Sequence, residues 1–591
     1  MCDYLSSFNV LIGHNCIAFD FAVLRKLYNY SYKGTIVDTL LMSRTQRVNR
    51  KNPHGYGGRA PHSVEAWGYR LGKNKYEHED WTKFSDKMLE RCHQDVDIQH
   101  EIYRFLLKEG EGKWEKAHKL NSKIFQYLQL QEERGFTIDI KHLDKSIQTL
   151  ERWIDRINNA LLPHLPLIVD VLETKTNGVY TYVKKPFKQS GELRSNTRDY
   201  IRNYGGDYSS ICGPFSRFNI RPLNLDSTIE IKDFLLNLGW QPEKWNEKNG
   251  QRTSANLSKD ETFNGVQGSL GSLIVKRIQC RQRRSVLTGW RTRCSLRNDR
   301  KLTSKVAGIA TTGRLRHSVI VNIPSVTSGA FFAKQMRQCF IPRDGMVMVG
   351  VDSKGNQMRQ LAARMQDDIS NRESVKEFTD AVLFGTKEER TDLHSLNQKR
   401  SGASTRTLAK NFFYGSILFG AGDAKTGKIL GVQPKDARRI KESYFEEMPA
   451  LEKVIKILTR EWKITAKQQW NQAYHRIEYR DGTIKGLDGR PIVVPYEKDL
   501  LCYALQSDEA IHMGVAYVML HKWAEERGWD EEDWGMLIWM HDEFQMESIP
   551  ELSVSLGKLG CEAIKWAGEY LGIKCLHDGD YLIGESWYVT H

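Results

Sequence analysis

Hydrophobic residues recur at helical spacing in three segments of the first third of the chain. These segments run from Ser85 to Leu107, from Trp114 to Arg134 and from about Ile140 to Leu162. The second segment ends at Gly135 and the third ends before Pro163, and both residue types commonly mark the end of a helix. The pattern therefore predicts three long helices.

Two strand-like apolar runs lead into carboxylates. The first, Met346 to Val351, leads into Asp352. The second, Met536 to Met540, leads into His541-Asp542-Glu543 and continues through Phe544 to Met546, which predicts a β-hairpin with acids at its tip. The alternatives are a helix N-cap for the first acid and a plain acidic turn for the hairpin. If the two strand ends meet in space, their carboxylates could hold two metal ions for phosphoryl transfer.

Cationic and aromatic side chains share one face of another predicted helix. Arg406, Lys410 and Tyr414 recur every four residues, which places them on the same side. Two like charges at this spacing repel each other slightly, and a bound polyanion would relieve the repulsion. This face could grip a triphosphate and stack on a base, whereas the alternative is an exposed basic face with an incidental tyrosine.

We expect three regions along the chain. Residues 1–110 mix short apolar runs with helical segments, as in an α/β domain. Residues 111–300 carry two of the long helices and a stretch from 177 to 264 in which glycine, serine and asparagine favour loops. Residues 301–591 contain the acidic and cationic motifs.

The most basic segment is Lys276 to Lys301, where Asp299 is the only acid. Leu287 and Trp290 within it indicate a helix packed on one side. It is either a solvated helix face or a surface that follows phosphates. The whole chain has 87 lysines and arginines against 73 aspartates and glutamates, a net charge of +14, which favours a polyanionic partner.

Composition excludes several classes of protein. Of 591 residues, 40% are hydrophobic and 27% are charged, which is typical of a globular protein and not of a disordered one. No apolar run approaches the length of about 18 residues that a transmembrane helix requires, and no signal peptide is recognisable. Ten cysteines without a CxxC pair favour neither a disulfide scaffold nor a zinc ribbon. We expect a reduced protein with no membrane association, located in the cytoplasm, which is the host's cytoplasm if the chain is viral.

Together the motifs resemble motifs A, B and C of the family A, or polymerase-I-like, DNA polymerases, and most closely the phage replicative branch. Further matches occur in the family's order, at Thr312-Gly313-Arg314, Asn322-Ile323-Pro324, Asp392-Leu393-His394, 419–423, 486–490, Leu505-Gln506-Ser507 and 583–591. The resemblance implies an α+β right-hand polymerase with palm, fingers and a thumb drawn from residues 111–300. Such an enzyme adds dNTPs to the primer 3′-hydroxyl on a template, with two Mg²⁺ ions.

The resemblance also implies roles for the matching residues. The metal-binding groups would be the carboxylates of Asp352 and Asp542 and the main-chain carbonyl of Ser353, with Glu543 as a supporting catalytic acid. The nucleotide-binding residues would be Arg406, Lys410, His394, Tyr414 and Gln357. Primer-template contacts that do not depend on base sequence would come from Arg314, Gln506 and His541. A tyrosine at position 414 implies relaxed discrimination against dideoxynucleotides.

Two positions depart from the family pattern. The residue that gates the sugar 2′-hydroxyl is usually Glu, but here it is Gln357, which keeps the bulk and loses the charge. We hypothesise that the steric block on ribonucleotides survives in a weakened form. Three residues separate Tyr414-Gly415 from Phe419-Gly420, where the family usually has two. One extra residue turns a helix by about 100°, so we predict a bulge at the end of this helix.

The N-terminal region resembles part of a ribonuclease-H-like 3′→5′ exonuclease of the DEDD type. His14 to Asp20 matches the second motif of that family and Gln94-Asp95-Val96 matches the third. The first motif, Asp-x-Glu, is missing, and Arg91 stands where a tyrosine usually orients the water. Two carboxylates leave a two-metal site incomplete. We expect a truncated domain with little or no proofreading, unless another polypeptide or an upstream start supplies the missing strand.

Three other functions remain open from the sequence. The first is a nucleic-acid-binding protein that has lost catalysis, which the retained aspartates and the Arg406 face disfavour. The second is a nuclease acting through Asp20 and Asp95. The third is an RNA polymerase of related architecture, which the bulky Gln357 disfavours. A processivity factor is a possible partner, although no thumb insertion for one is identifiable between residues 163 and 275.

Overall fold

The computed structural model describes the chain except for residues 74, 76, 77, 79, 81, 172–181, 204–211, 217, 243, 249, 250, 258, 259, 261, 262, 322, 327, 328, 367–371, 473 and 474. By packing, the chain forms two units. One joins Met1–Asp139 with Cys294–His591, and the other is Ile140–Arg293. The division into 1–110, 111–300 and 301–591 stays a prediction. All ten cysteines are free, and no helix among the described residues has both the length and the apolar character needed to cross a bilayer.

The N-terminal part of the first unit contains two parallel strands with helices around them, as expected for an α/β region. Strands β1 and β2 pair in register from Val10↔Thr35 to Gly13↔Asp38. The buried Asp38 carboxylate accepts hydrogen bonds from four backbone amides, two of them at the start of α3, so it fixes the strand-to-helix turn. The elements are α1 (Cys2–Ser6), β1 (Val10–Gly13), α2 (Asp20–Tyr28), β2 (Thr35–Asp38), α3 (Thr39–Gln46), α4 (Val64–Leu71) and α5 (Asp86–Gly110).

The three long helices predicted from hydrophobic spacing are confirmed. They are α5, α6 (Glu115–Arg134) and α7 (Ile140–Leu161). Ser85 caps α5 by accepting a hydrogen bond from the amide of Met88, and Gly135 follows α6 with a φ of 66°, a value that costs glycine little. The apolar face of α6 packs on α19 (Leu500–Glu526) and β19 (Trp534–Met540).

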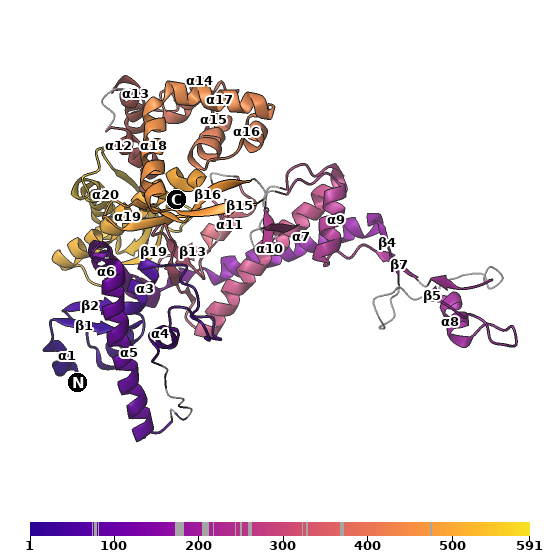
Figure 1. Ribbon diagram of the computed structural model, residues 1–591, viewed down its shortest axis with the longest axis horizontal. Coiled ribbons are helices and arrows are strands. Elements are labelled where there is room, and N and C mark those ends of the chain that lie inside the picture. Colours follow the sequence, from indigo (N-terminus) through magenta and orange to yellow (C-terminus); the bar gives the residue numbers. More distant parts are fainter. Residues whose placement is uncertain are drawn as a thin grey trace. The chain divides into compact units, whose positions relative to one another are not determined.

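A four-stranded antiparallel sheet of order β19-β20-β14-β21 lies at the centre of the first unit (Figure 1). The predicted hairpin is confirmed, with β19 and β20 (Glu543–Ser548) as its arms. The predicted strand before Asp352 is β14 (Val347–Ser353), which pairs with β20 on one side and β21 (Gly579–Gly584) on the other. Helix α20 (Ser553–Tyr570) packs on β14 and β21, and the buried apolar side chains between these elements stabilise the sheet by about 1.5–3 kcal/mol each.

The helices that follow β14 form a second group within the same unit (Figure 1). Helix α15 widens at its end into a π-helical turn, η4, where the amide of Phe419 donates to the carbonyl of Tyr414 at 2.9 Å, five residues back. The predicted bulge is therefore confirmed. The elements are α12 (Asn356–Met365), α13 (Arg372–Leu383), α14 (Leu393–Ser401), α15 (Arg406–Phe412), η4 (Phe413–Leu418), α16 (Asp423–Leu430), α17 (Pro434–Glu447) and α18 (Pro449–Thr465).

Short strands and turns connect these groups. The remaining elements of the first unit are β3 (Phe136–Ile138), β10 (Lys301–Leu302), β11 (Val306–Ile309), β12 (Leu315–His317), α11 (Ala333–Gln338), β13 (Phe340–Ile341), β15 (Lys467–Asn471), β16 (Arg476–Arg480), β17 (Gly482–Lys485), β18 (Pro491–Val494), η5 (Glu497–Asp499) and η6 (Pro550–Leu552).

The second unit contains more regular structure than the sequence suggested. The expectation of loops over 177–264 is wrong where helices and strands are described. One example is α9, where Ser227 caps the N-terminus by accepting a hydrogen bond from the amide of Glu230. Polar residues here cap and connect elements and do not replace them. Besides α7, the elements are η1 (Leu162–His164), β4 (Leu167–Val171), β5 (Tyr182–Val183), α8 (Ser195–Asn203), β6 (Phe215–Ser216), β7 (Phe218–Pro222), α9 (Thr228–Asn237), β8 (Trp245–Lys248), β9 (Gln251–Ala255) and α10 (Gly268–Arg297).

Helix α10 contains most of the basic segment. Leu287 and Trp290 are buried, which confirms a helix packed on one side. Several of its arginines form ion pairs with acids from elsewhere in the second unit, namely Arg277 and Arg281 with Asp226, Arg284 with Glu151 and Arg291 with Asp144. The local sequence, in which Asp299 is the only acid, therefore overstates the uncompensated positive charge of this helix.

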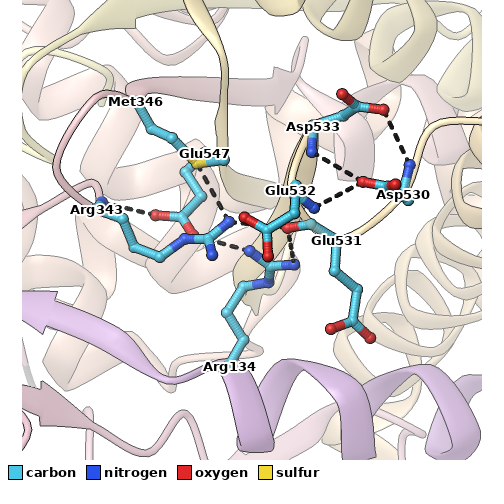
Figure 2. Close-up of polar contacts among 8 residues, drawn as sticks. All are labelled: Arg134, Arg343, Met346, Asp530, Glu531, Glu532, Asp533 and Glu547. Atoms are coloured by element: carbon cyan, nitrogen blue, oxygen red, sulfur yellow. Dashed lines mark hydrogen bonds and ion pairs between the residues drawn. The ribbon is translucent and has the colours of Figure 1, made fainter.

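A buried carboxylate ties α6 to the central sheet (Figure 2). Glu547 of β20 accepts hydrogen bonds from Arg134 Nη1 at 3.0 Å and from Arg343 Nε at 2.7 Å, and its side chain is fully buried. Both guanidinium groups also donate to the carbonyl of Glu531 at 2.9 Å. The acidic turn Asp530–Asp533 closes on itself through hydrogen bonds from its own amides. One buried acid thus compensates two arginines from distant parts of the chain.

We predict that Glu547→Ala destabilises the first unit by about 3–5 kcal/mol, because it leaves two arginines without their buried counter-charge. Guanidinium chloride unfolding followed by tryptophan fluorescence measures the change. Asp344→Ala is the matched control, since that acid pairs with Arg300 at the exposed surface. A loss below about 1 kcal/mol, the range of surface pairs, would contradict the prediction.

Candidate active site

Antiparallel pairing brings the two motif aspartates side by side. Asp352, near the end of β14, pairs in register with Glu543, the first residue of β20. The amide of Ser353 donates to the carbonyl of Asp542 at 2.9 Å, so the ends of motifs A and C are joined through their backbones. His541 completes the turn with a φ of 61°, a conformation that non-glycine residues rarely adopt. The hairpin therefore places Asp542 beside the strand that carries Asp352.

The gathered acids perturb one another. Burial raises the pKa of Asp352 to about 8, and the negative charges of Asp542 and Glu543 contribute. Burial also raises the pKa of Asp542 to about 6, followed in importance by the charge of Glu509. Bringing like charges together disfavours ionisation, and a bound cation would reverse this effect.

The donor set fits a magnesium site. No group of three or more His, Cys, Asp and Glu side chains able to hold a metal is found among the described residues, so the protein itself offers the two carboxylates of Asp352 and Asp542. Mg²⁺ typically takes one or two carboxylates, and water and substrate phosphates complete its octahedral shell. Two carboxylates at adjacent strand ends therefore match this metal better than they match a closed protein cage.

Glu543 lies beside these acids but turns into the protein. Its carboxylate accepts hydrogen bonds from Gln545 Nε2 and Trp587 Nε1, both at 2.6 Å, and from His591 Nδ1 at 3.0 Å. Burial alone would raise the pKa of Glu543, but the hydrogen bond and charge of His591, the charge of Arg337 and the hydrogen bond from Trp587 outweigh it and lower the pKa. The last residue of the chain is thus attached to the strand that follows Asp542.

Four of the five predicted nucleotide-binding residues lie on α14, α15 and η4, whereas Gln357 lies on α12. Thr405 caps α15 by accepting from the amide of Leu408, so the helix begins at Arg406. The rings of His394 and Tyr414 lie 5.8 Å apart between centroids. Burial lowers the pKa of His394 to about 4, and the positive charges of Arg406 and Lys410 contribute. His394 is therefore neutral at pH 7, and it lies within electrostatic reach of Arg406 and Lys410 and in ring contact with Tyr414.

The ion pairing of the two cations and the surroundings of Tyr414 determine how this helix face could bind a ligand. The guanidinium of Arg406 is held by Asp392, with an Nη2 to Oδ1 distance of 2.7 Å, whereas Lys410 is exposed and forms no ion pair with a described residue. Burial raises the pKa of Tyr414, and the charges of Asp542 and Glu509 add to the effect. The end of the motif B helix therefore lies near the carboxylates of the sheet.

The predicted DNA-contacting residues lie around the same carboxylates. Arg314 Nη2 donates to Glu509 Oε1 at 2.5 Å. Burial lowers the pKa of His541, and the charge of Arg314 contributes. Gln506, one helical turn before Glu509 on α19, donates to Cys502 Sγ at 3.1 Å. Asn322, which belongs to the family match that follows Arg314 in the chain, lies outside the described residues.

Sequence reasoning missed Glu509. It accepts from both Arg314 and Gln357, the latter through Nε2 at 2.8 Å, and only 2% of its surface is exposed. Asp508 beside it is also buried and binds Arg364. The signal was two adjacent acids inside the otherwise apolar run of α19, because buried acids require partners.

The exonuclease-like acids do not form a comparable cluster. Asp20 begins α2, and burial together with the charge of Asp38 raises its pKa. Asp95 of α5 forms ion pairs with Lys75 at 2.7 Å and with Arg91 at 3.9 Å. Among the described contacts none joins Asp20 to Asp95.

Comparisons with known proteins agree with this geometry. The family model for DNA polymerase family A matches residues 202–589, which is more than half of the chain. The chain belongs to DNA polymerase family A. It is therefore a DNA-directed DNA polymerase that copies a template, and members of its family use divalent metal ions, generally magnesium.

Two of the polymerase's relatives are the DNA-directed DNA polymerases of Escherichia phage T7 and Enterobacteria phage T3. Each is 25% identical, over 684 and 681 aligned residues respectively, and each alignment covers 98% of this chain and 92% of the relative. A similar solved structure is the POL domain of Pol1 from M. smegmatis in complex with DNA primer-template and dNTP, with a TM-score of 0.64 and 14% identity over 95% of this chain and 84% of that one. This likeness supports the predicted α+β polymerase fold.

We predict that Lys410→Gln raises the pKa of His394, because removing a nearby positive charge favours the protonated ring. The rise should be modest, since burial is the larger cause of the depressed value and stays in place. NMR titration of ¹⁵N-labelled histidine measures it. Lys435→Gln, on α17, should leave the titration unchanged, and an unchanged or lower pKa in Lys410→Gln would contradict the described arrangement.

Proposed function

We propose that this polymerase extends primer 3′-hydroxyl ends with deoxynucleotides during replication of phage DNA in the cytoplasm of the host cell. Its family and the phage origin of the T7 and T3 relatives support this proposal. The single observation that carries the site assignment is the hydrogen bond from the amide of Ser353 to the carbonyl of Asp542, which sets Asp352 beside Asp542.

The proposed metal ligands are Asp352, Asp542 and the main-chain carbonyl of Ser353. Two bound magnesium ions would supply charge stabilisation at the attacking and leaving oxygens. The chain's own contribution is to hold two mutually repelling carboxylates at fixed strand ends, so that little reorganisation is needed when the ions bind. Glu543 would act as a supporting acid, keeping the strand after Asp542 in place through its own hydrogen bonds.

The proposed nucleotide site is formed by residues of α12, α14, α15 and η4. Lys410 is exposed and would contact the triphosphate, together with Arg406 as oriented by Asp392. The neutral ring of His394 would donate a hydrogen bond to a phosphate oxygen. Tyr414 would stack on the sugar and base, and Gln357 would lie against the 2′ position.

The proposed DNA contacts extend over the rest of the chain. Arg314, Gln506 and His541 would touch primer and template near the reacting end. The central sheet would form the palm, the group from α13 to α18 the fingers, and residues 111–300 the thumb, with the basic helix α10 facing the duplex. A processivity factor remains a candidate partner.

We predict that Asp352→Ala lowers primer extension by at least about a thousandfold, equivalent to about 4 kcal/mol of transition-state stabilisation. Duplex binding, which rests on the cationic contacts, should change by less than about threefold. A gel-based extension assay with Mg²⁺ and a fluorescence-anisotropy titration measure the two quantities. Asp344→Ala is the control for loss of a surface acid, and persistent extension by Asp352→Ala would refute the site assignment.

We also propose that 3′→5′ proofreading is weak or absent in this chain, because Asp95 is paired with Lys75 and Arg91. A 5′-labelled single strand incubated with the polymerase and Mg²⁺, without dNTPs, should stay intact over hours. Asp20→Ala should behave the same way. Degradation that disappears in Asp20→Ala would instead establish an active nuclease.

A further inference from the structure

A buried carboxylate without an assigned role lies between two proposed substrate-contacting residues. Glu509 lies in the middle of α19, whose side chains are otherwise largely apolar, and only 2% of it is exposed. Burying an unpaired carboxylate costs several kcal/mol, so its partners must compensate it closely.

Each of its oxygens has one partner from a different segment. Oε1 accepts from Arg314 Nη2 at 2.5 Å, and Oε2 accepts from Gln357 Nε2 at 2.8 Å. Arg314 comes just before β12 and Gln357 lies in the first turn of α12. The carboxylate therefore joins the proposed reader of primer-template and the proposed sugar gate into one hydrogen-bonded unit.

This contact explains why position 357 is an amide. Gln357 donates one N–H of Nε2 to Glu509, and its carbonyl oxygen is not used in this contact. A glutamate at this position would place a second carboxylate at hydrogen-bond distance from Glu509, and two such groups cannot both stay ionised without a large penalty. Family members usually carry this negative charge at the position of Gln357. Here it is on Glu509 of α19, which contacts Gln357.

We infer that Glu509 is a positioning residue for nucleotide selection, which fixes the amide of Gln357 and the guanidinium of Arg314 together. The discrimination against ribonucleotides is then a property of the Gln357–Glu509 pair and not of Gln357 alone. This inference rests on the proposed roles of Gln357 and Arg314 in the polymerase reaction.

A residue swap tests the pair. In Gln357→Glu the two facing carboxylates repel, so kcat/KM for a dNTP should fall by at least about tenfold and the ratio of rNTP to dNTP incorporation should rise. Adding Glu509→Gln restores one acid and one amide with the positions exchanged, because the new amide can donate to the carboxylate introduced by Gln357→Glu and accept from Arg314. The double variant should therefore return both quantities to within about threefold of the unmodified polymerase.

Single-nucleotide primer extension with dNTP and rNTP, analysed as a double-mutant cycle, provides the measurement. Glu509→Gln alone should raise the rNTP to dNTP ratio, whereas Glu526→Gln, an exposed acid of the same helix that pairs with Lys522, should leave it unchanged. Thermal unfolding of each variant shows whether the fold is kept. If Gln357→Glu lowers the midpoint, Glu509→Gln must restore it as well.

Additive losses in the double variant would overturn the inference, since they would mean that Glu509 acts independently of the gate. Wild-type selectivity in both single variants would also overturn it. Neither result touches the proposed function, which is tested separately by whether Asp352→Ala abolishes extension by an otherwise active polymerase.

Discussion

The pairing of β14 with β20 is the constraint from which the chemistry of this polymerase follows. Nearly two hundred residues separate the two strands in the chain, yet the hydrogen bond between Ser353 and Asp542 fixes their ends in one register. A slip of one residue would turn every side chain of the strand to the opposite face of the sheet. The buried apolar positions along β14 oppose such a slip, so the hydrophobic core determines where the carboxylates lie.

Concentrating acids in this way is costly, and the fold compensates each acid differently. Asp508 and Glu547 have arginine partners, and Glu543 is surrounded by neutral donors and His591. Asp352 and Asp542 have raised pKa values instead of a protein counter-charge. Of the acids named here, the two without a cationic or hydrogen-bonded partner are thus those proposed to bind metal, which is the pattern expected of a functional site.

Much of this organisation could be predicted because it has a local signal. Helical spacing gave α5, α6 and α7, and an apolar run that ends in an acid gave β14 and the hairpin. The extra residue after Tyr414 predicted the widened turn. The partners of buried charges had no such signal, because Glu547 binds Arg134 from more than four hundred residues away and Asp226 neutralises arginines of α10 across the second unit. The loop prediction for 177–264 failed for a related reason, since composition does not reveal that a serine such as Ser227 caps a helix.

The π-helical turn η4 ends the helix that begins with α15, and its two ends are under different demands. From α15 into the first residues of η4, the four-residue spacing of Arg406, Lys410 and Tyr414 must be kept for the three side chains to share a face. At the other end of η4, Ile417 and Leu418 must reach the core. A turn that can widen by one residue absorbs an insertion locally, so neither part has to rotate. Chain length can therefore drift within 415–418 during evolution, while between 406 and 414 a single insertion or deletion would be selected against.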